Sequence, residues 1–190
     1  KRRPFSGLAI LALIVVSAIG AYKYVPTFEQ KVDYFKYSWK VFGEGRYDSD
    51  YSDIGRLVSY DIALKLIPQY PLAGTGIGDM HDVMREGYGK WYPGVPEFQQ
   101  LKPHNQFLIV ALGCGIPALL IFFVWILYPL KWMNKSRDGF FLFAIWMVMF
   151  VPLMVEPFLE LQFGVYVYLF FILWMAHAIK PAISETKNNS

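Results

Sequence analysis

The sequence predicts an all-α membrane protein, in which four apolar helices cross the bilayer and a helical region lies outside it. Three observations predict this fold. Hydrophobic residues make up 55% of the 190 residues and charged residues only 17%, whereas a soluble domain carries about 25% charged residues. The apolar residues gather in four long runs with almost no charge. Aromatic residues reach 18%, which is typical of proteins that meet a membrane–water interface.

The same composition excludes several classes of protein. The single cysteine excludes a disulfide framework and a cysteine-based zinc site. A formal net charge of only +3 gives no basic surface of the kind that binds nucleic acid. We therefore expect the lipid bilayer, and no nucleic acid, as a partner, and we expect no metal or other cofactor.

Four segments have about the length that a membrane-crossing helix needs. A hydrocarbon core of about 30 Å is crossed by about 17–25 helical residues. The expected spans are 1–25, 104–130, 139–155 and 163–179. A re-entrant segment in place of one span is the alternative.

The first span could also be a secretory signal peptide, because a basic Lys1-Arg2-Arg3 start precedes its apolar run. That run, however, is longer than the usual length of about 7–15 residues, and no cleavage site with small residues precedes a polar chain. The chain also begins without methionine. We expect an internal helix of a longer protein.

The distribution of lysine and arginine predicts the orientation of the spans. The chain start, the link 131–138 and the tail 180–190 are basic, whereas the link 156–162 carries two glutamates and no base. Because cytoplasmic loops are enriched in lysine and arginine, both termini are expected in the cytoplasm. The long, nearly neutral stretch 26–103 is then expected outside.

The external stretch 26–103 predicts three helices and an irregular connector. The expected helices are 28–42 capped by Thr27, 54–69 capped by Asp53, and a shorter one that Asp79 caps and that ends at about Tyr88. Residues 89–103 hold three prolines and two glycines, which favours an irregular connector before the second span.

Arg56 is the first candidate functional residue. On a helix it shares one face with Tyr60, Ala63 and Ile67, so its charge needs a partner or a ligand. One interpretation is a salt bridge to Asp53, or a side chain that reaches out to solvent. The other is a clamp for an anionic group, because a guanidinium binds phosphate oxygens in bidentate geometry.

The glycine-rich sequence 74–78 is the second candidate. Its Gly-x-Gly-x-Gly spacing and its surroundings differ from the dinucleotide-binding fingerprint. Backbone N–H groups of Gly74 and Gly76 could still present themselves to an anion before a helix N-terminus. A plain turn is the other interpretation.

His104 and Asn105 directly precede the second span, so they are expected at the outer membrane surface. An imidazole there can act as a base near neutral pH, or it can be an interfacial side chain without a chemical role. His81 stands among acidic residues that could hold a metal, but no second ligand set accompanies it. A solvated helix face is the favoured interpretation of His81.

Glu156 and Glu160 flank Pro157 at the outer end of the third span. Carboxylates so close to hydrocarbon are candidate functional residues. An ordinary loop between two spans is the alternative.

Taken in order, these motifs resemble the O-antigen ligase and O-antigen polymerase family of bacterial membrane proteins. Arg56 begins the pattern, a Pro-Leu-x-Gly-x-Gly turn follows at 71–76, and His104-Asn105 then enters a span with small residues. A glutamate-bearing link before the last span matches the closing segment of the family. The resemblance covers about residues 54–179.

The resemblance implies a membrane glycosyltransferase of GT-C type in the bacterial inner membrane. It implies transfer of a glycan from an undecaprenyl-diphosphate carrier to an acceptor hydroxyl, on lipid A–core or a growing polysaccharide, at the periplasmic face. Carried over by position, Arg56 would contact the diphosphate and His104 would be the catalytic base. The expected substrate-binding residues are Arg56, Gly74, Gly76, Asn105, Glu156 and Glu160.

The chain departs from the family in having four spans instead of about ten to twelve. We therefore expect the C-terminal part of a longer enzyme, or an inactive truncated fragment. A non-catalytic membrane protein that binds an anionic glycolipid is an alternative function. A transporter fragment is disfavoured, because Gly113, Gly115 and Pro117 interrupt the second span without an accompanying charge.

Overall fold

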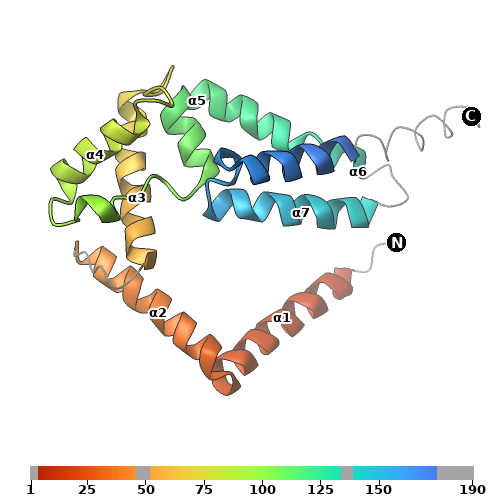
Figure 1. Cartoon of the computed structure of the whole chain (residues 1–190). Coiled ribbons are helices and arrows are strands. Elements are labelled where there is room, and N and C mark those ends of the chain that lie inside the picture. The colour runs from red at the N-terminus through yellow and green to blue at the C-terminus, as the bar shows by residue number, and fades with distance from the viewer. Residues whose placement is uncertain (1–3, 46–51, 134–138, 175–190) are drawn as a thin grey trace, which may run out of the picture. The chain divides into compact units, whose positions relative to one another are not determined.

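The structure, a computed structural model, describes residues 4–45, 52–133 and 139–174 of the chain (Figure 1). Helices and turns make up these ranges, and they contain no strand, which confirms the predicted all-α class. The chain divides into two compact units, Lys1–Ile54 and Gly55–Ser190. The predicted tail 180–190 and the end of the last predicted span lie outside the described residues.

The first unit contains α1 (Pro4–Tyr24) and α2 (Pro26–Gly43), which meet in a corner at Val25 (Figure 1). The Tyr22 hydroxyl donates to Asp33 at 3.1 Å, and the Lys36 ammonium donates to both. The predicted Thr27 cap is wrong. Val25 occupies the cap position without a side-chain hydrogen bond, because Pro26 starts the helix where a missing N–H costs nothing.

The second unit begins within α3 (Ser52–Leu66), which continues into a 3-10 turn, η1 (Ile67–Gln69). Helix α4 (Met80–Trp91) follows, and the connector then contains η2 (Glu97–Gln99). The Tyr92 hydroxyl joins the end of α4 to α3 by donating to Asp61 at 2.8 Å. The predicted helices are therefore confirmed, with shifted ends.

Two further predicted helix caps, at Asp53 and Asp79, are wrong as well. Asp53 lies inside the first turn of α3, which begins at Ser52. Asp79 occupies the position before α4, but its side chain forms no cap hydrogen bond.

The remainder of the second unit is an apolar bundle. It consists of α5 (Gln106–Leu127), the short α6 (Leu130–Met133), α7 (Gly139–Val155), η3 (Phe158–Glu160) and a closing helix (Gln162–Trp174). Within the described ranges one helix, α5, is long and apolar enough to cross a membrane by length and composition. Helix α7 and the closing helix are shorter and apolar. Four membrane spans therefore stay a prediction.

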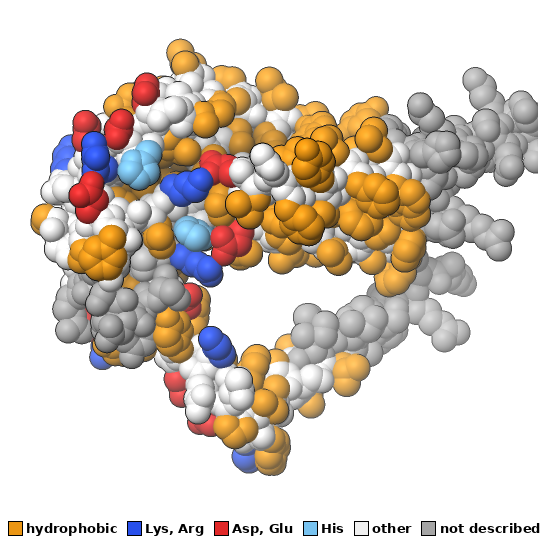
Figure 2. Space-filling view, in the orientation of Figure 1, with side chains coloured by type: hydrophobic (Ala, Val, Ile, Leu, Met, Phe, Trp, Pro, Cys, Tyr) orange, Lys and Arg blue, Asp and Glu red, His pale blue; other side chains and the backbone are white. Residues whose placement is uncertain are grey.

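Large side chains hold the bundle together. Buried residues from α5, α7 and the closing helix form its core: Ile126, Leu142, Trp146, Met149, Leu153 and Tyr168. The Trp146 indole N–H donates to the Ile126 carbonyl at 2.8 Å, so its polar atom is satisfied inside the core. In Figure 2 the surface of the bundle is largely hydrophobic, whereas charged side chains gather over the α3–α4 part of this unit.

Helix α5 is broken near its middle. Gly115 has φ 86° and ψ 172°, and Pro117 follows inside the helix without an N–H to donate. The residues 70–78, here called the glycine turn, pack against this break. Thr75 N–H donates to the Leu112 carbonyl at 2.7 Å, Gly76 N–H to Gly113 at 3.0 Å, and Ile116 N–H to Pro71 at 2.8 Å.

Glycine is required where the two backbones meet. A Cβ atom on Gly74 would collide with the backbone of Gly113, and one on Gly115 would collide with the Leu72 carbonyl. Both residues also have positive φ angles, of 70° and 86°, which side chains disfavour. The glycine turn and the broken helix thus form one backbone-to-backbone junction.

Candidate active site

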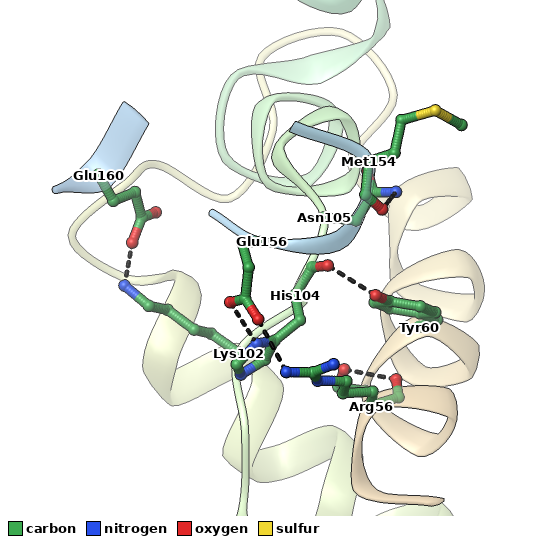
Figure 3. A network of polar contacts seen from close by, with 9 residues as sticks. Arg56, Tyr60, Lys102, His104, Asn105, Met154, Glu156 and Glu160 are labelled. Carbon is green, nitrogen blue, oxygen red and sulfur yellow. Dashed lines mark hydrogen bonds and ion pairs between the residues drawn. The ribbon is translucent and has the colours of Figure 1, made fainter. Parts of the chain in front are cut away.

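Three segments that lie far apart in the sequence bring Arg56, His104 and Glu156 together (Figure 3). Arg56 lies in α3, His104 lies two residues before α5, and Glu156 directly follows α7. Oε1 of Glu156 accepts a hydrogen bond from the Arg56 guanidinium at 2.8 Å. Its Oε2 lies 2.9 Å from Nδ1 of His104. One carboxylate therefore holds a guanidinium and an imidazole at the same time.

The local sequence explains why Glu156 lies where the helix ends. Its N–H still donates to the Pro152 carbonyl, at 2.9 Å. The next residue, Pro157, disfavours helical backbone at the residue before it, so α7 ends and the chain turns. The carboxylate leaves the apolar helix at this turn and points toward α3 and the start of α5 (Figure 3).

The backbone around His104 is fixed from two sides. The Tyr60 hydroxyl donates to the His104 carbonyl at 2.6 Å. Asn105 caps α5, because its Oδ1 accepts from the N–H groups of Phe107 and Leu108 at 2.9 and 3.1 Å. Its amide also donates to the Met154 carbonyl at 2.8 Å. These bonds hold the imidazole, of which 23% is exposed, against Glu156.

Arg56 pairs with a carboxylate other than Asp53, and its binding of an anionic ligand stays a prediction. Its guanidinium pairs with Glu156 and not with the neighbouring Asp53, and 40% of its side chain remains exposed. The hydroxyl of Ser59 donates to the Arg56 carbonyl at 2.7 Å, inside the same helix. The exposed part of the Arg56 side chain can thus contact a ligand from solvent, while Glu156 balances its charge.

A second set of contacts connects the turn after α7 to the start of α5. Lys102 and Glu160 form an ion pair, which is drawn beside Glu156 in Figure 3. The buried Gln106 accepts a hydrogen bond from the Leu159 N–H at 2.8 Å through its Oε1. Glu156 and His104 are therefore held on two segments that are themselves tied together.

A cavity of about 870 Å³ lies beside His104, within the range of about 300–1,000 Å³ typical of ligand pockets. Its polar wall includes Lys102, His104 and Glu160. Its apolar wall includes Ile77, Met80, Ile109, Val110 and Leu159. Arg56 and Glu156 do not line it. A ligand in this cavity can therefore reach the imidazole while resting on an apolar surface.

The glycines of the predicted anion site have a structural role. Gly74 N–H donates to the Tyr70 carbonyl at 3.2 Å, and Gly76 N–H donates to Gly113. These two groups are thus already used within the chain. Anion binding by Gly74 and Gly76 stays a prediction that this geometry does not favour.

Tyr60, Lys102 and Gln106 were missed by the sequence reasoning. Tyr60 offered a signal, since it lies one helical turn after Arg56. Lys102 and Gln106 flank His104 but match no spacing rule. Within the part of the chain that the structure describes, no three His, Cys, Asp or Glu side chains gather closely enough to hold a metal ion. His81 is exposed beside Asp82.

Comparison with protein families finds a match over residues 1–123, to a family described as O-antigen ligase. The matched range contains Arg56, the glycine turn, His104 and Asn105, and it ends before Glu156. A comparison with curated proteins finds no match.

Proposed function

Because the chain belongs to the O-antigen ligase family of bacterial membrane proteins, we propose that it transfers a glycan from an undecaprenyl-diphosphate carrier to an acceptor hydroxyl. The acceptor is lipid A–core or a growing polysaccharide, and the reaction takes place at the outer face of the inner membrane. The observation that carries this proposal is the pairing of one carboxylate, Glu156, with both Arg56 and His104.

His104 acts as the general base in this proposal. When Nδ1 donates its proton to Glu156, the second ring nitrogen, Nε2, is left as an acceptor. The cavity beside His104 offers room for the acceptor sugar. Nε2 takes the proton of the acceptor hydroxyl while its oxygen attacks the anomeric carbon of the donor. Positioned proton transfer of this kind contributes about 10²–10⁴-fold in rate.

Arg56 stabilises the leaving group. As the new bond from oxygen to the anomeric carbon forms, the bond from that carbon to the diphosphate breaks. The electron pair stays on undecaprenyl diphosphate, whose growing negative charge a guanidinium binds in bidentate geometry. A single displacement of this kind inverts the anomeric configuration.

The placement of the two groups supports this division of roles. Glu156 holds Arg56 with one oxygen and His104 with the other, and only His104 of the two lines the cavity. In this proposal the two groups act on different atoms, His104 on the attacking oxygen and Arg56 on the leaving diphosphate.

The decisive experiment separates chemistry from binding in membranes that contain the full protein. His104→Ala should lower transfer from a lipid-linked donor by about 10²–10⁴-fold, with donor binding and protein level unchanged. If His104→Ala retains full transfer, the enzymatic role of His104 is wrong. A protein that only binds an anionic glycolipid would lose binding with Arg56→Ala and lose nothing with His104→Ala.

A further inference from the structure

Gln106 is a buried polar side chain in the wall of the cavity beside His104, and only half of its amide is used within the chain. The residue begins α5, lines the cavity and is 5% exposed. Its Oε1 accepts the Leu159 N–H at 2.8 Å. Because a backbone N–H can only donate, the amide atom that faces Leu159 must be the oxygen. The NH₂ group of Gln106 therefore points away from Leu159.

This NH₂ group has no hydrogen-bond partner among the residues that the structure describes. In those ranges the unpaired side-chain atoms that are sealed from solvent are the Ser38 hydroxyl and Oε1 of Gln100, and Nε2 of Gln106 is not one of them. Nε2 therefore borders open space, and the cavity is the space that Gln106 lines. Because buried polar groups are normally hydrogen-bonded, two unused N–H donors on so buried a side chain indicate a ligand that accepts them.

The charges in the wall of the cavity favour an uncharged ligand. Among the described residues that line it, Lys102 carries the ammonium group and Glu160 the carboxylate, and the two form an ion pair (Figure 3). His81, which also lines the cavity, is exposed beside Asp82. Arg56, the proposed partner of the diphosphate, does not line it. An anion in the cavity would meet Glu160 without an unpaired cation to balance it.

The first part of α5 supplies an apolar surface next to the Gln106 amide. Ile109, Val110 and Cys114 follow Gln106 by three, four and eight positions and line the same cavity. This spacing places them on one face of the helix, before its break at Gly115. A sugar ring suits such a wall, because it carries oxygen atoms around its rim and C–H groups on its faces.

We infer that the Gln106 amide donates to a neutral oxygen of the acceptor sugar, either a ring hydroxyl or an N-acetyl carbonyl. This bond turns another hydroxyl of the same sugar toward His104. Gln106 is then a substrate-binding residue that selects the acceptor, since a site built around a hydrogen bond discriminates strongly against ligands that cannot form it. The inference rests on the proposed function for calling the sugar the acceptor, but sugar binding in the cavity is testable without transfer.

Protection of a cysteine in the cavity measures this binding. In the full protein in detergent, Cys114 is replaced by alanine, and Val110→Cys places a thiol one helical turn from Gln106. Its alkylation by iodoacetamide is followed by mass spectrometry. The probes are the methyl glycosides of glucose, galactose and N-acetylglucosamine, and inorganic phosphate. Phe98→Cys, on the connector and 85% exposed, is the control for effects on the reagent itself.

At least one glycoside should slow alkylation at position 110 several-fold and leave alkylation at position 98 unchanged, and phosphate should slow neither. Gln106→Met removes both N–H donors, so it should abolish protection by the sugar. The rate without sugar should stay that of the parent, which shows that the cavity is intact. Protection by phosphate, protection that survives Gln106→Met, or no protection by any of the three glycosides would overturn the inference.

Gln106→Glu separates ligand binding from the bond to Leu159. A glutamate oxygen can still accept the Leu159 N–H, but the NH₂ group is gone, so protection should again be lost. The measurement is made at mildly alkaline pH to keep the glutamate ionised. Protection that is lost in Gln106→Met but kept in Gln106→Glu would assign Gln106 a purely structural role and overturn the inference.

Kinetics in membranes connect the cavity to transfer. Gln106→Met and Gln106→Glu should each raise the KM for the acceptor several-fold, with a smaller change in kcat. Gln69→Glu, an exposed residue outside the cavity, is the matched control and should change neither. An unchanged acceptor KM in both Gln106 variants would overturn the inference even if transfer is confirmed. Protection that depends on Gln106 in a protein without transfer would refute the proposed function and leave the sugar site standing.

Discussion

The imidazole Nδ1 of His104 lies 2.9 Å from Oε2 of Glu156, although the two residues are 52 positions apart. The same carboxylate pairs with Arg56, which is 100 positions away. Glu156 therefore sets the orientation of the proposed base and the position of the proposed cation together. In the proposed mechanism it is a positioning residue, since it touches the reacting groups only through other side chains.

Substitution of Glu156 should lower the turnover rate more than it changes substrate affinity. Glu156→Gln keeps an acceptor for the His104 N–H but removes the charge that balances Arg56, so we expect a loss smaller than that of His104→Ala. Kinetics with varied acceptor should show a lower kcat and a nearly unchanged KM. Glu97→Gln, an exposed carboxylate beside Arg85, is the control. A change in KM alone would contradict the positioning role.

An exchange of charges between Arg56 and Glu156 distinguishes a structural ion pair from a functional one. Arg56→Glu and Glu156→Arg should each lower transfer, and Arg56→Ala should lower it by about 10²–10³-fold. The double variant restores opposite charges, which as a partly exposed pair stabilise by only about 0.2–1 kcal/mol. We expect the double variant to recover the unfolding temperature of the parent but not its transfer activity. The two quantities are measured side by side.

Recovery of activity in the double variant would mean that Arg56 acts only through its ion pair. Arg85→Ala is the matched control for loss of an arginine. Its side chain is exposed on α4 and pairs with Asp82, away from His104, so transfer should be unchanged.

Alanine at the backbone junction should destabilise the protein. Gly115→Ala imposes a side chain on a residue with φ 86° and ψ 172°, which costs about 1–3 kcal/mol, and it adds a collision with the Leu72 carbonyl. Gly89→Ala is the control, because Gly89 lies in α4 with open space around it. It should stabilise by about 0.5–1 kcal/mol. Unfolding in detergent measures both, and equal effects would argue against the junction.

The raised pKa of the Tyr92 hydroxyl predicts that the protein loses stability at alkaline pH. Burial raises the pKa of Tyr92 above its ordinary value of 10.0, and the hydrogen bond to Asp61 raises this pKa further. The folded state thus holds the hydroxyl proton more tightly than the unfolded state. The stabilisation is complete below pH 10.0 and is lost as the pH rises through the folded pKa.

Tyr92→Phe removes this titration together with one hydrogen bond. The variant should be less stable at neutral pH, by about 0.5–1.5 kcal/mol. Its free energy of unfolding should fall less steeply above pH 10.0 than that of the parent. Chemical unfolding on both sides of that pH measures the difference, and identical slopes would refute the role of Tyr92.

The helices were predictable because their signals are local. Apolar runs, together with the prolines and glycines that interrupt helices, predicted the ends of α1 to α5 and of α7 to within a few residues. The helix caps were less predictable, since Pro26 and Ser52 start helices earlier than Thr27 and Asp53 would. The cap that does form, at Asn105, belongs to a residue that the sequence suggested for substrate binding.

The site was predictable as a set of residues but not as an arrangement. Arg56, His104 and Glu156 were each singled out, yet no spacing rule indicates that one carboxylate joins the other two. Such contacts depend on how α3, α5 and α7 pack, which a single sequence does not encode in any short pattern. The pairing of the glycine turn with α5 was missed for the same reason, because it consists of main-chain atoms.

The junction between the glycine turn and α5 also couples two segments during folding. The break at Gly115 leaves backbone groups of α5 without helical partners, and their partners lie in a turn that the ribosome makes earlier. Because unpaired backbone groups are costly to bury, neither segment is complete alone. We expect the two to fold as one unit.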